Sequence, residues 1–319
     1  MYLLEIFEVK MFSKYSKALV IGAGSGRDIA SSVLITEKLR EQGINVDLAG
    51  FLTPWALHEF DGELEKTVNG ASKPSRKYIA TREEISLDSY FEPKLPEINE
   101  ELGLGIGEIY LFSLQYGTER LREELEGLVA QRGYDLIMAV DVGGDILAHK
   151  QDLGSVYTPI VDLSCIEILA DLKTTTDKYL TVVAPGVDGE IPSQRLAEII
   201  GNERVLRRDQ LTPESKNYQI FVQVYDEINR RTKSSSHTGE IIRKVVEGES
   251  DFIEEYKRGN VSFAVQLDKE LASGIYYFDL DAVKSQRRNI RISYENISQA
   301  HRLMKEMGAS GTEVDLVPR

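Results

Sequence analysis

Short apolar runs alternate with amphipathic stretches over the first two thirds of the chain. Each apolar run is bounded by glycine or polar turn residues, which is the pattern of a strand buried in a sheet. Between these runs, apolar residues recur three and four positions apart, which is typical of helices. The runs predict strands at 17–23, 44–52, 108–114, 134–145 and 178–190. The helical spacing predicts helices at 25–43, 118–133 and 160–173, and we expect an irregular insertion at 53–77.

Repeated strand–helix–strand units predict a Rossmann-like, doubly wound α/β fold, with a mostly parallel sheet covered by helices on both faces. The pattern changes after residue 202. From there it predicts helices at 213–232, 239–258 and 295–308, and strands at 261–267 and 273–283. We therefore expect an α/β domain over 1–202 and a smaller C-terminal α+β part over 203–315. The last four residues, 316–319, read Leu-Val-Pro-Arg, as in the remnant of a cleavable tag, and we leave them out of the fold.

Charge and composition argue against two classes of partner. The net charge of −14 would repel a phosphate backbone, and the short basic clusters contain no interleaved aromatic residues, so we expect no nucleic-acid partner. No apolar run approaches the roughly 20 residues of a membrane helix, so we expect no membrane partner.

The single cysteine, Cys165, lies among apolar residues and fits a buried position in a cytoplasmic protein. Soluble α/β proteins of this length are often symmetric, and we expect a homo-oligomer.

The first candidate loop reads "VIGAGSGRDIA" from residue 20. It differs from the Rossmann fingerprint G-x-G-x-x-G because Arg27 stands where the third glycine belongs. Its backbone can still bind an anion: Gly24 allows close approach, and a helix beginning near Ser25 offers free N–H groups. Arg27 would add a bidentate contact, and Asp28 would interact with the helix dipole. The alternative is a steric turn between a strand and a capped helix. The glycines of this loop are Gly22, Gly24 and Gly26.

The second candidate loop follows the most apolar strand and reads "DVGGDILAHK". Asp141 ends the strand, where an unpaired carboxylate is unfavourable to bury, and Asp145 follows four residues later. Gly143 and Gly144 give the backbone between them the freedom to turn. Two carboxylates at a strand end can hold Mg²⁺, accept ribose hydroxyls or act as a base. The alternative is that Asp145 caps the next helix and Asp141 bonds to loop amides.

The third candidate loop reads "APGVDGEIP" and supplies Asp188 and Glu190. A turn needs aspartate and glycine for its own geometry, so a purely structural role is the alternative. His149 lies between the second and third loops and is a candidate acid or base. The sequence thus gives catalytic candidates Asp141, Asp145 and His149, of which the two aspartates are also metal ligands.

Four segments carry a resemblance to a known family. They are "GAGSGRD", "YDLIMAVDVGGDIL", "GSVYTPIVDLSCIEIL" and "VVAPGVDGEI", and the third contains Gly154, Pro159 and Asp162. In this order they resemble the archaeal and bacterial family called domain of unknown function 1152, over roughly residues 17–280. The resemblance implies the fold and the choice of loops. It implies no reaction.

These patterns favour a protein that binds a nucleotide or another phosphorylated small metabolite at the carboxyl ends of the strands, with Mg²⁺ assisting transfer or hydrolysis. The alternatives are a non-catalytic ligand-binding or sensor protein that uses the same cleft, and an oligomeric scaffold with no small-molecule role. Loop side chains decide the substrate, and the fold alone does not name it.

Overall fold

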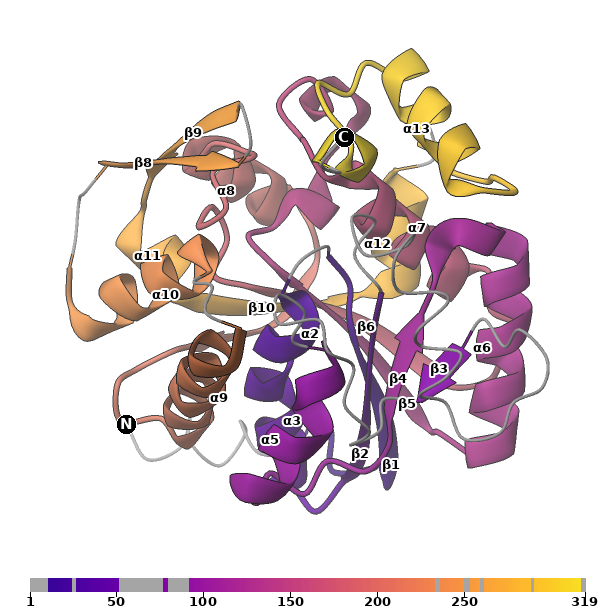
Figure 1. The fold of residues 1–319 in the computed structure, drawn as a ribbon, viewed down its shortest axis with the longest axis vertical. Helices are drawn as coiled ribbons and strands as arrows, with labels where there is room; N and C mark the ends of the chain where they lie inside the picture. The colour runs from indigo at the N-terminus through magenta and orange to yellow at the C-terminus, as the bar shows by residue number, and fades with distance from the viewer. Residues whose placement is uncertain are drawn as a thin grey trace.

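One eight-stranded sheet organises the part of the chain that the computed structural model describes (Figure 1). That part comprises residues 11–24, 27–51, 77–79, 92–232, 236–249, 253–258, 261–287 and 290–316. The strand order is β3-β4-β2-β1-β5-β6-β10-β7. The strands are β1 (Lys17–Gly22), β2 (Asn45–Phe51), β3 (Lys77–Ile79), β4 (Ile109–Phe112), β5 (Leu136–Val142), β6 (Asp177–Val183), β7 (Val205–Gln210) and β10 (Gly274–Asp279).

The centre of the sheet is parallel. β1 pairs in parallel with β2 on one side and with β5 on the other, while β4 and β6 extend this parallel set outwards. Numbered in chain order, these five strands follow the Rossmann order 3-2-1-4-5. The connections from β1 and from β5 therefore leave in opposite directions, and their carboxyl ends form a topological switch point. In this class of sheet, ligands bind at such a point.

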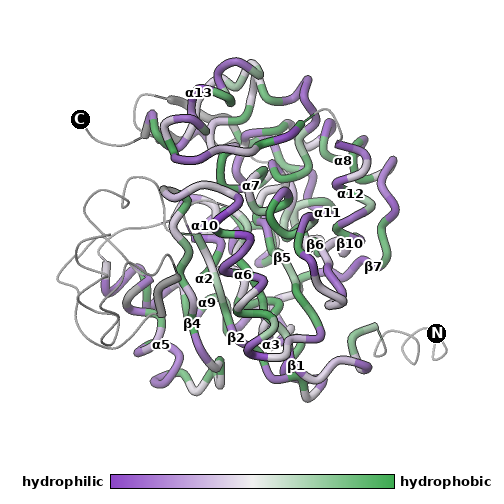
Figure 2. Tube along the Cα trace, turned by 90° about the vertical axis from the view of Figure 1, so that its right-hand side faces the viewer, coloured by the Kyte–Doolittle hydropathy of each residue, from purple (hydrophilic) through white to green (hydrophobic). Residues whose placement is uncertain are grey.

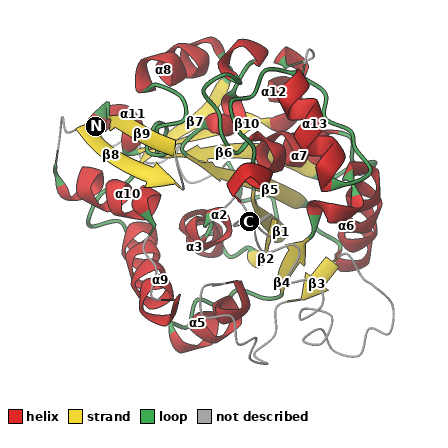
Figure 3. Cartoon of the chain, turned by 45° about the horizontal axis from the view of Figure 1, so that its top comes forward, coloured by secondary structure: helices red, strands yellow, loops and turns green. Residues whose placement is uncertain are grey.

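Helices cover both faces of the sheet (Figure 3). On one face lie α2 (Asp28–Ser31), α3 (Val33–Arg40) and α9 (Lys216–Thr232). On the other lie α6 (Thr118–Arg132), α7 (Pro159–Ala170) and α12 (Leu280–Gln286). Every residue of β5 is buried between these layers, and Figure 2 shows the hydrophobic colour along it. The structure confirms the predicted fold class, a mostly parallel α/β sheet flanked by helices.

The remaining elements are short helices and turns and one small sheet. They are α5 (Leu95–Glu101), α8 (Ser193–Asn202), α10 (His237–Glu247), α11 (Lys269–Ala272) and α13 (Ile297–Glu306), a second sheet of β8 (Ile253–Arg258) and β9 (Val261–Gln266), and the 3₁₀ turns η2 (Glu92–Lys94), η3 (Leu114–Tyr116), η4 (Asp145–Leu147), η5 (Lys150–Asp152) and η6 (Glu313–Leu316). Within the residues described, no helix is long and apolar enough to cross a membrane.

The strand predicted over 273–283 is wrong at its end, because residues 280–283 belong to α12. One predicted helix is wrong in its second half. The helix expected over 239–258 ends at Glu247, where Gly248 adopts a left-handed conformation with φ 113°. The chain then forms β8, which pairs antiparallel with β9. Glycine has no Cβ to oppose this conformation, so it commonly terminates helices.

The expected division at residue 202 stays a prediction. β7 and β10, which follow that residue, lie in the same sheet as β1. β10 is antiparallel to both of its neighbours, β6 and β7. The insertion predicted at 53–77 falls almost wholly outside the described residues.

Candidate functional site

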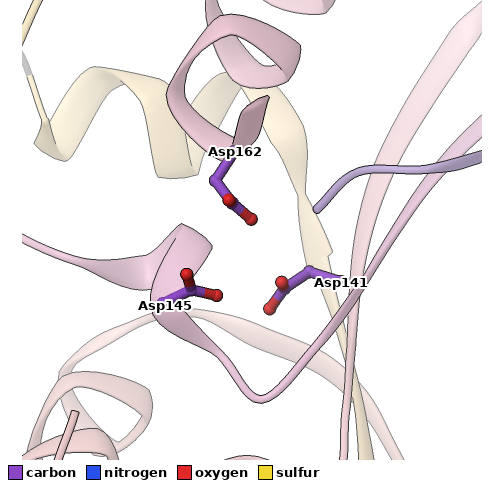
Figure 4. A group of neighbouring side chains, drawn as sticks. All are labelled: Asp141, Asp145 and Asp162. Atoms are coloured by element: carbon purple, nitrogen blue, oxygen red, sulfur yellow. The ribbon is translucent and has the colours of Figure 1, made fainter. Parts of the chain in front are cut away.

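Three buried aspartates converge at the switch point (Figure 4). Asp141 is the penultimate residue of β5, Asp145 begins η4, and Asp162 lies in the first turn of α7. Their relative exposures are 0%, 6% and 1%, and one carboxylate oxygen of each lies within 4.8 Å of the others. We call these three residues the aspartate triad.

Three of the six carboxylate oxygens of the triad have no hydrogen-bond partner in the part of the chain that the structure describes. Oδ2 of Asp141 accepts a hydrogen bond from the backbone N–H of Gly144 at 2.9 Å. Oδ1 of Asp141 and both carboxylate oxygens of Asp162 are buried and have no hydrogen-bond partner among the described residues. Buried acceptors without partners are unfavourable, so this arrangement calls for a cation or a donor-rich ligand.

Burial raises the pKa of each carboxyl in the triad. For Asp141 the pKa rises to about 7, and the N–H of Gly144 together with the carboxyl groups of Asp162 and Asp145 only partly opposes the rise. For Asp145 and Asp162 the pKa rises well above the ordinary value, first through burial and then through repulsion by neighbouring carboxylates. Burial and like charge both disfavour the ionised form, and a bound cation would reverse both effects.

Glycines make room for further acids beside the triad. A Cβ on Gly24 would overlap Oδ2 of Asp28 and would lie 3.2 Å from Oδ1 of Asp162. A Cβ on Gly143, which has a φ of 114°, would overlap the carboxylate of Asp188. The space over both glycines therefore belongs to side chains of the site itself. The side chains of Asp28 and Asp188 are only 8% and 4% exposed.

Two glutamates hold the N-terminal end of α7, which carries Asp162. The carboxylate of Glu190 accepts hydrogen bonds from the backbone N–H groups of Tyr157 and Thr158 and from the hydroxyl of Thr158. Glu313, from the turn η6, accepts from the N–H groups of Ile160 and Val161. Burial raises the pKa of Glu313 to about 8 although these amides oppose the rise. The free N–H groups of this helix end are thus occupied by the protein's own carboxylates.

Backbone hydrogen bonds join the loops that follow β5 and β6. The N–H of Gly143 donates to the carbonyl of Val183, and the N–H of Gly186 donates to the carbonyl of Gly143 at 2.6 Å. Beside them, Ala184 has a φ of 51°, the one non-glycine residue with a positive φ in the described parts of the chain. Alanine in this region is strained, and such strain is frequent at functional sites.

Two predicted site residues interact with groups outside the triad. The guanidinium of Arg27 hydrogen-bonds to Oδ1 of Asn229 at 2.5 Å, and it lies over the ring of Tyr225. It is held by α9. The pKa of His149 is lowered by burial and then by Arg287, and none of the triad acids is among the groups that perturb it. Ser25 and Gly26 lie outside the described residues.

The sequence interpretation assigned no site role to Asp162 or Glu313. In the sequence, Asp162 stands out only because it lies in a segment that resembles the family and in the first turn of a predicted apolar helix. An aspartate in the first turn of an apolar helix, three residues after Pro159, is the signal that the sequence offers. Gly22, by contrast, has a packing role: a Cβ there would overlap the backbone of Ile29, so glycine allows α2 to lie against β1.

The comparison with protein families decides the relationship. Residues 19–317 match the family described as "Protein of unknown function (DUF1152)". The chain belongs to this family. The match spans nearly the whole chain and includes the triad and Glu313, and it assigns no activity. A comparison with curated proteins gives no match.

Proposed function

We propose that the aspartate triad binds a divalent cation, Mg²⁺, and that the cation holds a nucleotide or another phosphorylated small metabolite at the carboxyl ends of the strands. One observation supports this most directly. At the switch point, three buried carboxylates face one another, and three of their oxygens have no hydrogen-bond donor within the described parts of the chain. Carboxylate oxygens are the ligands that Mg²⁺ prefers in proteins.

The spacing of the triad suits a cation after a small adjustment. Oxygens bound to Mg²⁺ at 2.0–2.1 Å lie about 3 Å apart when adjacent and about 4 Å apart when opposite. The triad oxygens lie within 4.8 Å of one another. Side-chain movements that shift these oxygens by about 1 Å would bring them to the spacing that Mg²⁺ requires. The donor set contains oxygen alone, which favours Mg²⁺, Mn²⁺ or Ca²⁺ over softer metals.

The acidic surroundings explain why a phosphorylated ligand would need the cation. After burial, the largest influences on the pKa of Asp145 are four carboxylates, those of Asp162, Glu190, Asp141 and Asp188. A phosphate group would be repelled by these charges, whereas a bound Mg²⁺ would bridge them to the phosphate. The cation would also polarise the phosphoryl oxygens and so assist transfer or hydrolysis. We place this activity in the cytoplasm, consistent with the single buried thiol of Cys165.

Calorimetric titration tests this proposal. A panel of nucleoside mono-, di- and triphosphates and sugar phosphates is titrated into the protein, once with Mg²⁺ and once with EDTA. We expect heat of binding for at least one compound with Mg²⁺ and none with EDTA. Product analysis of each binding compound then separates turnover from binding alone. If Mg²⁺ binds under none of these conditions, the proposal is refuted.

A further inference from the structure

We propose that Asp162 bridges two divalent cations: the first shared with Asp141 and Asp145, and the second shared with Asp28 and completed by phosphate oxygens of the ligand. The inference rests on the proposed function, because it assigns a second cation to the same site. It names a ligand, Asp28, and a stoichiometry that the triad alone does not require.

Asp162 has the free coordination capacity that a bridge requires. Its relative exposure is 1%, and neither of its carboxylate oxygens has a hydrogen-bond partner among the described residues. Figure 4 shows its carboxylate directed from α7 toward Asp141 and Asp145. A carboxylate with two uncommitted oxygens can bind one cation through each.

The carboxylates of Asp28 and Asp162 approach each other beside Gly24. Oδ2 of Asp28 and Oδ1 of Asp162 both border the point where a side chain of residue 24 would begin. After burial and Asp141, Asp28 is the next group that raises the pKa of Asp162, which agrees with this proximity. Oδ2 of Asp28 also accepts a hydrogen bond from the N–H of Val142 at 3.2 Å, which fixes the carboxylate toward β5.

Two protein carboxylates are few for a cation, and this makes the second site dependent on a ligand. Mg²⁺ is commonly bound by one or two carboxylates, several waters and substrate phosphates. In two-metal sites the ions lie about 3.5–4 Å apart and share bridging ligands. The second cation would therefore bind tightly only when a phosphate group supplies the remaining oxygens. The glycine at 24 adds no side chain of its own to this space, which the two carboxylates border.

Manganese binding monitored by electron paramagnetic resonance tests the proposal. Mn²⁺ is titrated into the protein with and without pyrophosphate, which serves as the phosphate probe. We expect two bound Mn²⁺ per chain with pyrophosphate and an exchange-coupled spectrum. Asp28→Asn should bind one Mn²⁺ without coupling, since the amide oxygen still accepts from Val142 but no longer carries charge. Asp171→Asn is the matched control, because Asp171 is exposed at the other end of α7, and it should behave as wild type.

Each outcome decides between the two proposals. One Mn²⁺ per chain in the wild type with pyrophosphate would overturn the bridge and leave the triad site standing. No bound Mn²⁺ would overturn both. Two bound ions without exchange coupling in the wild type would show that Asp162 does not bridge them. A spectrum of Asp28→Asn identical to that of the wild type would show that Asp28 binds neither ion. The wild-type spectrum alone tests the bridge if the Asp28 variant fails to fold.

Discussion

Replacing Asp162 with asparagine separates a functional acid from a structural one. Its two oxygens accept no hydrogen bond among the described residues, so the change removes an ionisable carboxyl without removing an accepted bond. With an effective dielectric constant of 20, two ionised carboxylates at the triad's 4.8 Å limit repel each other by about 3.5 kcal/mol. This repulsion has an upper limit, because a carboxyl can take up a proton instead of staying ionised. For Asp141, whose pKa is about 7, ionisation in the folded protein is disfavoured by roughly 4 kcal/mol. We therefore expect Asp162→Asn to stabilise the metal-free protein by about 1–4 kcal/mol at pH 8.

The same substitution should remove the response to cations. At a Mg²⁺ concentration 100 times the dissociation constant, binding stabilises the wild type by about 2.7 kcal/mol. If the loss of one ligand weakens binding 100-fold, the gain falls to about 0.4 kcal/mol. At roughly 2 °C per kcal/mol for a chain of this length, the Mg²⁺-induced shift falls from about 5 °C to below 1 °C.

Thermal melts in EDTA and in Mg²⁺ measure both effects. Asp162→Asn should melt about 2–8 °C above the wild type in EDTA and should respond little to Mg²⁺. Asp171→Asn should match the wild type in both. A variant that melts below the wild type in EDTA and keeps its full Mg²⁺ shift would show that Asp162 is a structural residue, and the reasoning would fail.

Three further predictions concern the neighbouring loop, the C-terminal turn and assembly. Gly24→Ala forces a methyl group against Asp28, so we expect the free energy of unfolding to fall by about 1–3 kcal/mol and the Mg²⁺-induced shift of the melting temperature to disappear. Gly127→Ala, which places its methyl group in open space on α6, should keep that shift. An unchanged Mg²⁺ shift in Gly24→Ala would contradict this prediction. The pKa of about 8 at Glu313 exceeds its unfolded value, so its stabilising contribution is present below about pH 4.5 and is lost as the pH rises through 8. Denaturant titrations at several pH values give the free energy of unfolding as a function of pH. Between pH 5 and 8 this free energy should fall less steeply in Glu313→Gln than in the wild type, by about 1.4 kcal/mol per pH unit. An equal pH dependence in the two proteins would refute the assignment. Light scattering should give at least twice the chain mass at micromolar concentration, and a monomer mass would refute self-association.

Local patterns were sufficient to predict the parallel core of the sheet. The apolar strand that ends in Asp141 was identifiable because a carboxylate closing such a run is unusual. The segment 253–258 was wrongly predicted as helix because its structure depends on pairing with β9, which lies beyond it in the chain.

The candidate site was less predictable because contacts between distant residues assemble it. Asp162 joins Asp141 and Asp145 only when α7 packs at the switch point, and nothing in its local sequence specifies those partners. The ligand contact expected of Arg27 stays a prediction, and its hydrogen bond to Asn229, a residue far along the chain, is not readable from the loop sequence. Charge and spacing identify candidate groups, whereas packing determines which of them meet.

The position of β10 has a consequence for how the molecule reaches its folded state. Among the described strands, β7 pairs with β10 and with no other, and β10 lies between β7 and β6. During synthesis, β7 is therefore complete some sixty residues before its only neighbour in the sheet exists. Until then the edge of β6 is open and can accept strands from other chains. A chain stalled before Gly274 should aggregate through that edge, and the last quarter of the sequence is what closes it.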